Sequence, residues 1–62
     1  MYFVQWTNND DYTDFDEFDY REEAERELTR LVSTGAKIDF IIKGKKVNYE
    51  VVEVVTRVEL SE

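Results

Sequence analysis

The sequence predicts an α+β fold, with one helix packed across one face of an antiparallel sheet of three or four strands. Apolar residues alternate with polar ones in residues 2–6 and again in residues 37–43, which is the period of a strand. Between these segments, residues 20–34 carry an apolar stripe at the period of a helix. The 62 residues allow a single domain, of order ββαββ, or βαββ if residues 12–18 are not a strand.

The first predicted element is a β-hairpin. Aromatic and β-branched residues alternate over residues 2–6 and favour a strand. The run Asn8-Asn9-Asp10-Asp11 is typical of a turn, because Asn and Asp tolerate left-handed backbone conformations. Residues 12–18 then return as a second, very acidic strand. The alternative is a helix that begins at Thr13 or Asp14.

The helix is predicted over residues 20–34. Asp19 stands where an N-cap is expected, and Glu22 follows three residues later as in a capping box. Gly35 provides the C-terminal stop, because glycine adopts the left-handed conformation at least cost. The apolar stripe consists of Tyr20, Ala24, Leu28, Leu31 and Val32.

The second half of the chain predicts two more strands. Residues 37–43 alternate, and Gly44-Lys45 is a hairpin turn signal. Residues 46–60 form a long β-branched run whose parity changes part of the way along. A bulge near Val51-Val52 accounts for the change. Such a strand would pair with residues 37–43 along its first half and with the N-terminal strand along its second.

One helix covers one face of the sheet, so the core follows from parity. The expected core is Val4, Trp6, Phe18, Ala24, Leu28, Leu31, Ile38, Phe40, Ile42, Val51, Val54 and Val58. The opposite parity holds Phe3, Ile41 and Val55, which is more apolar surface than a small monomer usually exposes. This surplus favours a partner, such as a second copy of the chain.

Composition excludes several kinds of chemistry. The chain contains neither His nor Cys, which excludes disulfides, Cys- or His-centred nucleophiles and the usual zinc, haem and iron–sulfur ligands. An EF-hand that begins at Asp14 would need Gly at its sixth position, where the chain has Asp19. Carboxylate pairs on a convex surface lack the pocket that splits their pKa values. We therefore expect no enzyme activity, no metal site and no cofactor.

Charge is distributed unevenly along the chain. The net charge is −7, from 8 Lys and Arg against 15 Asp and Glu. Residues 10–27 hold ten acidic residues and two arginines, so this segment carries −8 and the rest of the chain +1. Glu17–Arg21 and Glu22–Arg26 have the spacing of helical ion pairs. Lys43, Lys45 and Lys46 form a basic hairpin tip, for which the alternatives are a phosphate contact and a solvated turn. The net negative charge opposes affinity for nucleic acid, so we expect no direct binding of nucleic acid.

Two interpretations of the acidic segment remain open. In one, the acids keep a small sheet protein soluble and prevent edge aggregation. In the other, they form a surface that mimics nucleic acid and binds a basic protein surface, because duplex DNA carries one charge per ~1.7 Å of its axis. The residues predicted to contact the partner are Asp10, Asp11, Tyr12, Asp14, Phe15, Asp16, Glu17, Asp19, Glu22 and Glu23.

The first half of the chain resembles a known group of proteins in its general pattern of residues, without a shared motif. The run from Tyr2 to Trp6, then Glu17-Phe18-Asp19 leading into Glu22-Glu23-Ala24 and Gly35, is similar to small acidic proteins of bacteriophages and mobile elements. Some of these proteins are anti-CRISPR or anti-restriction inhibitors that dock onto the nucleic-acid channel of a host enzyme. The resemblance implies an inhibitor of that type and assigns no residue.

The sequence also bears on location. The opening residues lack the basic and apolar regions of a signal peptide, and no apolar run approaches the ~20 residues of a membrane span. We expect a soluble protein of the cytoplasm, of the host cell if a phage encodes it. The runner-up function is a small structural or regulatory module that self-associates through the uncovered sheet face.

Overall fold

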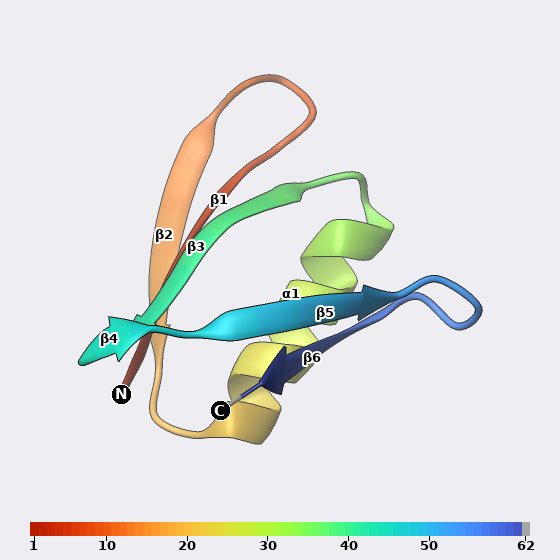
Figure 1. Ribbon diagram of the computed structural model, residues 1–62. Helices are drawn as coiled ribbons and strands as arrows, with labels where there is room; N and C mark the ends of the chain where they lie inside the picture. The colour runs from red at the N-terminus through yellow and green to blue at the C-terminus, as the bar shows by residue number, and fades with distance from the viewer. Residues whose placement is uncertain (62) are drawn as a thin grey trace.

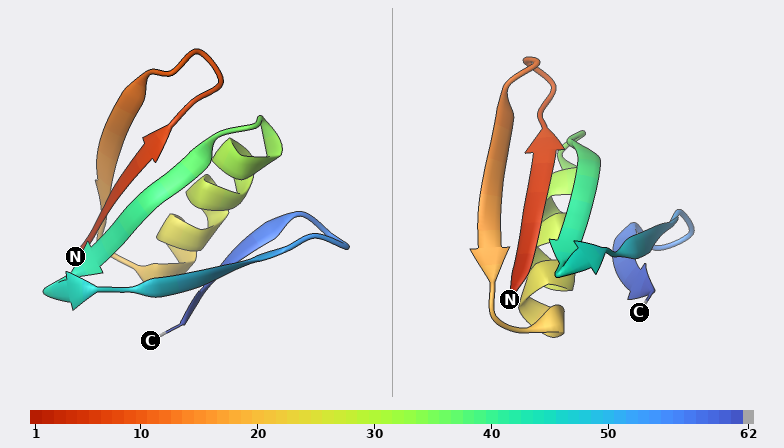
Figure 2. Two further views of the ribbon diagram at one scale, coloured as in Figure 1. Left: turned by 45° about the horizontal axis from the view of Figure 1, so that its top comes forward. Right: turned by 60° about the vertical axis from the view of Figure 1, so that its left-hand side comes forward.

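The computed structural model describes residues 1–61 and confirms the α+β class (Figure 1). Its elements are β1 (Tyr2–Thr7), β2 (Thr13–Phe18), α1 (Arg21–Ser33), β3 (Lys37–Lys43), β4 (Lys45–Lys46), β5 (Asn48–Val52) and β6 (Arg57–Ser61). The first sheet has the strand order β2-β1-β3-β4, and β5 and β6 form a second, two-stranded sheet. The two sheets diverge near β4, and α1 lies in the angle between them (Figure 2).

The first hairpin forms as predicted, with β2 antiparallel to β1 along its whole length. Its turn is organised by Asn8, whose Oδ1 accepts hydrogen bonds from the backbone N–H groups of Asp10 at 2.9 Å and Tyr12 at 3.0 Å. Asp11 has a positive φ of 63°, a conformation that Asp tolerates. The alternative in which a helix begins at Thr13 or Asp14 is therefore wrong.

The start of α1 differs from the prediction. The N-cap is Tyr20, whose backbone is extended with φ −121° and ψ 147° and whose side chain makes no capping hydrogen bond. Asp19 is therefore not the N-cap, because the extended residue that precedes the first turn lies one position later. Glu22 and Glu23 still occupy the first turn, where the helix dipole stabilises negative charge.

The helix ends as Gly35 predicts. Gly35 has φ 97°, and its N–H donates to the carbonyl of Val32 at 3.0 Å, while the N–H of Ala36 donates to that of Leu31 at 3.0 Å. These two bonds define a Schellman motif. The Asn9 side chain of the first turn donates to the carbonyl of Thr34 at 2.9 Å, which ties the hairpin to this end of the helix. Within residues 1–61, no helix is long and apolar enough to cross a membrane.

A β-bulge in β3 reverses the predicted orientation of its second half. The register between β1 and β3 shifts between Gln5 and Trp6, where β3 contributes one extra residue, Asp39. Ile41 is consequently fully buried, whereas Ile42 is 38% exposed. The predictions that Phe40 and Ile42 belong to the core and that Ile41 lies on the uncovered face are wrong, because alternation restarts after the extra residue.

The prediction of a long strand over residues 46–60 is also wrong. The chain reverses at residues 53–56, so β5 and β6 form a separate hairpin in which Val51 faces Val58. Residues that face one another in this hairpin have opposite parity, which explains the parity change without a bulge. Val54, predicted to be buried, lies in the turn and is 95% exposed. Val55 lies in the same turn and not on a sheet face.

The core lies between α1 and the inner faces of both sheets. The helix contributes Ala24, Leu28 and Leu31 and packs mainly against β6. Trp6, Phe18 and Val51, predicted core residues, are partly buried against this cluster. The buried apolar residues are Tyr2, Val4, Ala24, Leu28, Leu31, Ala36, Ile38, Ile41, Val47, Val58 and Leu60.

Adjacent isoleucines provide a test of the bulge. Ile41→Ala should lower the free energy of unfolding by ~2–5 kcal/mol, because it opens a cavity in the core. Ile42→Ala removes the same atoms from a partly exposed position and should cost much less. Urea unfolding followed by circular dichroism at low protein concentration measures both variants. Equal losses would contradict the register of β3.

Candidate functional site

The predicted partner-binding acids lie on one continuous segment of the chain that contains β2, an edge strand of the first sheet. We call this set the acidic edge: Asp10, Asp11, Asp14, Asp16, Glu17, Asp19, Glu22 and Glu23. All eight are exposed, and none forms an ion pair with another residue among residues 1–61. They follow the chain from the β1–β2 turn, along β2, to the first turn of α1.

The acids occupy both sides of this edge rather than one flat face. β2 is the outermost strand of its sheet, and successive side chains of a strand point to opposite faces. Asp16 pairs with Val4, which is buried beneath the helix, so Asp16 and Asp14 lie on the helix side. Glu17 pairs with Phe3 and lies on the uncovered side. A partner must therefore approach the edge itself to contact the whole set.

Two of these carboxylates also close the free edge of β2. Asp14 Oδ1 accepts the backbone N–H of Phe15 at 2.8 Å, and Asp16 Oδ1 accepts that of Glu17 at 2.8 Å. Both N–H groups belong to the outer side of the strand, where another chain would otherwise add a strand. The acidic edge consequently presents side-chain charge and not an open backbone.

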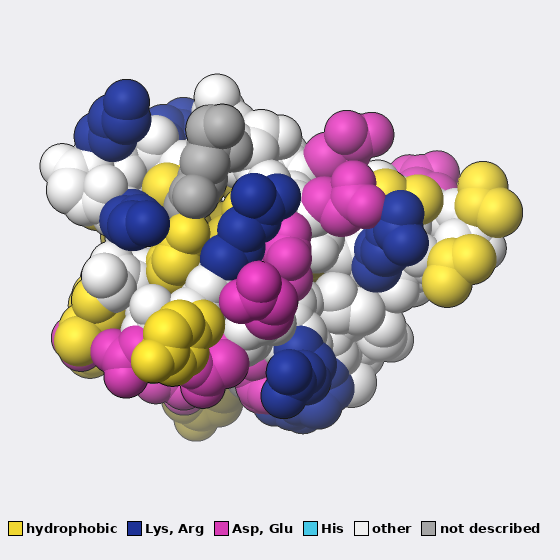
Figure 3. Space-filling model, turned by 90° about the horizontal axis from the view of Figure 1, so that it is seen from below, with side chains coloured by type: hydrophobic (Ala, Val, Ile, Leu, Met, Phe, Trp, Pro, Cys, Tyr) yellow, Lys and Arg dark blue, Asp and Glu magenta, His cyan; other side chains and the backbone are white. Residues whose placement is uncertain are grey.

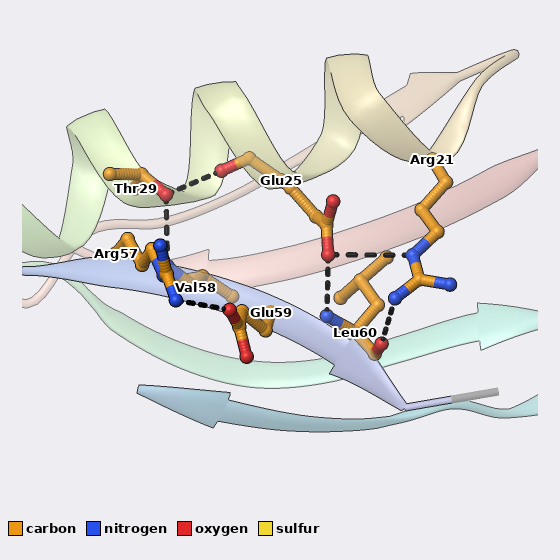
Figure 4. A network of polar contacts seen from close by, with 7 residues as sticks. All are labelled: Arg21, Glu25, Thr29, Arg57, Val58, Glu59 and Leu60. Carbon is orange, nitrogen blue, oxygen red and sulfur yellow. Dashed lines mark hydrogen bonds and ion pairs between the residues drawn. The ribbon is translucent and has the colours of Figure 1, made fainter. Parts of the chain in front are cut away.

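Three helix side chains at successive turns contact the outer edge of β6 (Figure 4). Arg21 Nη2 donates to the carbonyl of Leu60 at 2.7 Å, and Glu25 Oε2 accepts the Leu60 N–H at 2.8 Å. Thr29 Oγ1 accepts the N–H of Val58 at 2.9 Å and donates to the carbonyl of Glu25 at 2.6 Å. The side chains of Arg21, Glu25 and Thr29 therefore hold the second sheet on the helix.

The ion pairs predicted from spacing do not form. Arg21 pairs with Glu25 at 3.4 Å instead of Glu17, because its guanidinium is directed towards β6. Glu22 has no ion-pair partner within residues 1–61. Arg30 pairs with Glu27, and its hydrogen bonds lower the pKa of the Glu27 carboxyl below its ordinary value. Glu25 and Glu27, the last two acids of residues 10–27, therefore form ion pairs with other residues of the helix.

The uncovered face of the first sheet carries a cluster of stacked aromatic rings. The ring of Phe3 stacks on Phe15 with centroids 5.4 Å apart and on Phe40 with centroids 6.4 Å apart. Phe15 is 61% exposed although its ring stacks on Phe3, and Tyr12 at the end of the turn is 72% exposed. Exposed aromatic rings therefore lie directly beside the acidic edge.

The opposite edge of the same sheet is basic. Lys45 and Lys46 form β4, and Lys43 lies with its Nζ 4.9 Å from the centre of the Tyr2 ring. These lysines line a hollow of ≈ 450 Å³ between β4 and the end of β6. In Figure 3 acidic and hydrophobic side chains lie together at the lower left and Lys and Arg side chains at the upper left, while charges of both signs are mixed over the centre and right of this view. The first sheet is therefore polarised from β2 to β4.

Known proteins provide no further guide to this site. No protein-family model, no curated protein and no solved structure matches the chain. In the part of the chain that the structure describes, no group of three or more acidic side chains could hold a metal ion.

The contact between Thr29 and β6 yields a stability prediction. Thr29→Val keeps the shape of the side chain but leaves the Val58 N–H without its acceptor, which should cost ~1–3 kcal/mol in the free energy of unfolding. Thr29→Ser keeps the hydroxyl and should lose substantially less. Chemical denaturation of both variants measures the difference, and equally stable variants would refute the role of this bond.

The carboxylates on β2 yield a prediction about aggregation. The double variant Asp14→Ala and Asp16→Ala exposes two outward N–H groups and should associate through its edge. The matched variant Asp14→Asn and Asp16→Asn keeps a side-chain oxygen at each position, so it should stay closer to the wild type. Light scattering over hours at high concentration distinguishes them. If the alanine variant stays as dispersed as the asparagine variant, these bonds do not protect the edge.

Proposed function

We propose that this chain is a non-enzymatic binding protein whose acidic edge engages the basic surface of a nucleic-acid-processing enzyme and excludes nucleic acid from it. The observation that carries the proposal is the set of eight exposed carboxylates without ion-pair partners in residues 1–61. Solubility needs fewer charges, and their mutual repulsion destabilises the fold.

The spacing of the charges supports this function. β2 alone carries Asp14, Asp16 and Glu17, which is three charges within about 10 Å of an extended strand. Charges along one DNA strand are ~3.4 Å apart. A basic channel built for a phosphate backbone would therefore meet a similar density of negative charge.

Two features make the acidic edge suitable for recognition. The hydrogen bonds from the backbone to Asp14 and Asp16 fix these carboxylates before binding, which reduces the conformational entropy lost on association. Tyr12 and Phe15 lie beside the carboxylates and supply exposed aromatic surface, and aromatic residues are frequent binding anchors. Charge would then provide attraction, and the rings would provide apolar contact.

The resemblance to small phage and mobile-element proteins suggests which kind of enzyme the partner is. The partner would be a host enzyme of CRISPR or restriction defence, in the cytoplasm of the host cell. Inhibition requires no chemistry from this chain, because occupation of the channel is sufficient.

The test uses a variant that changes charge and little else. Asp14→Asn with Asp16→Asn removes two charges on the helix side while an oxygen remains for each backbone N–H. Immobilised wild-type protein should capture from bacterial lysate a nucleic-acid-binding enzyme that duplex DNA displaces, and the variant should capture much less of it. The wild-type complex should also weaken as salt rises.

The control and the contrary outcome are equally specific. Lys45→Gln alters a charge at the opposite edge of the sheet and should leave capture unchanged. If captured proteins bind wild type and the Asn variant equally, or if DNA does not compete, the acidic edge does not mimic nucleic acid.

A further inference from the structure

The uncovered face of the first sheet has a charge pattern that complements itself. The strand register places four residues in one row across this face: Glu17 on β2, Phe3 on β1, Ile42 on β3 and Lys46 on β4. The row has a negative end, two apolar residues in its middle and a positive end. Paired side chains of neighbouring strands lie on the same face, so the four are presented together.

A second row reinforces the apolar centre. It consists of Phe15 on β2, Gln5 on β1 and Phe40 on β3. Phe3 of the first row stacks on both phenylalanines of the second, so the three rings form one apolar patch. α1 packs on the other side of this sheet and leaves the patch uncovered (Figure 2).

We propose that the occupant of this face is a second copy of the chain, packed sheet against sheet about a two-fold axis that runs parallel to the strands. Such an axis exchanges the two ends of each row. Glu17 then faces Lys46 of the second copy, Phe3 faces Ile42 of the second copy, and each contact occurs twice.

Charge selects this axis over the other face-to-face arrangement. An axis perpendicular to the strands would place β2 on β2 and bring two acidic edges together, in a protein of net charge −7. Like charges across an interface are strongly unfavourable. The parallel axis instead puts each β2 opposite β4 of the other copy and keeps the two acidic edges on opposite sides of the dimer.

The size of the face sets the strength of the contact. Four strands at a spacing of ~4.8 Å make a face about 15 Å across, so it buries less than the ~800 Å² per partner of a standard interface. We therefore expect a reversible dimer that dissociates on dilution. This inference goes beyond the proposed function and shares Phe15 and Glu17 with it. In the dimer a basic partner would contact the remaining acids, among them Asp14 and Asp16 on the other side of the sheet.

Charge reversal tests the arrangement. In sedimentation velocity over a dilution series, Glu17→Lys and Lys46→Glu should each weaken the dimer at least about tenfold, because each places like charges together. The double variant reverses both ends of the row, so it should regain most of the wild-type association. Recovery in the double variant is specific to an interface in which these two positions meet.

Two other residues serve as controls. Glu23→Lys, on α1, and Lys45→Glu, one position from Lys46 and on the opposite side of the sheet, make the same charge changes and should leave the dimer intact. Far-UV circular dichroism checks that each variant is folded. A wild type that remains monomeric at every concentration, a double variant without recovery, or controls that dissociate as fully as Glu17→Lys would overturn the proposal.

Discussion

The arrangement of the molecule depends on the bonds between α1 and the outer edge of β6. A two-stranded hairpin is marginally stable by itself, and β5–β6 does not extend the first sheet. Arg21, Glu25 and Thr29 supply the donors and acceptors that a neighbouring strand would otherwise supply. The helix thereby holds both sheets and buries Val58 and Leu60 between them.

The packing of α1 against β6 leaves the side chains of β2 exposed. Because α1 packs mainly against β6, the outermost strand β2 has few neighbours, and the carboxylates along it form no ion pair within residues 1–61. Their hydrogen bonds to the backbone of β2 protect the edge whether or not a partner is present. Protection and recognition are therefore compatible roles for Asp14 and Asp16. The asparagine substitutions separate them, since an amide oxygen keeps the bond and removes the charge.

The sequence predicts the parts of the fold that depend on local signals. Alternation, the Asn-rich turn and Gly35 locate the first hairpin and the end of the helix. The β5–β6 turn was missed because Glu53-Val54-Val55-Thr56 contains no Gly, Pro, Asn or Asp. The bulge in β3 has no signal in the sequence, because Phe40, Ile41 and Ile42 are consecutive apolar residues that fit either parity. For the acidic edge, exposure was predictable, but its division between two faces depends on the register with β1.

That division allows one short strand to take part in two kinds of contact. Asp14 and Asp16 are directed to the helix side of β2, while Phe15 and Glu17 belong to the uncovered face. A dimer formed through the uncovered face engages the second pair and leaves the first exposed. Each dimer would then present two acidic edges, one on either side, and would bind two basic surfaces at once. The two contacts share Phe15 and Glu17, so in the dimer a basic partner would meet the acids that remain exposed, among them Asp14 and Asp16 of the same six-residue strand.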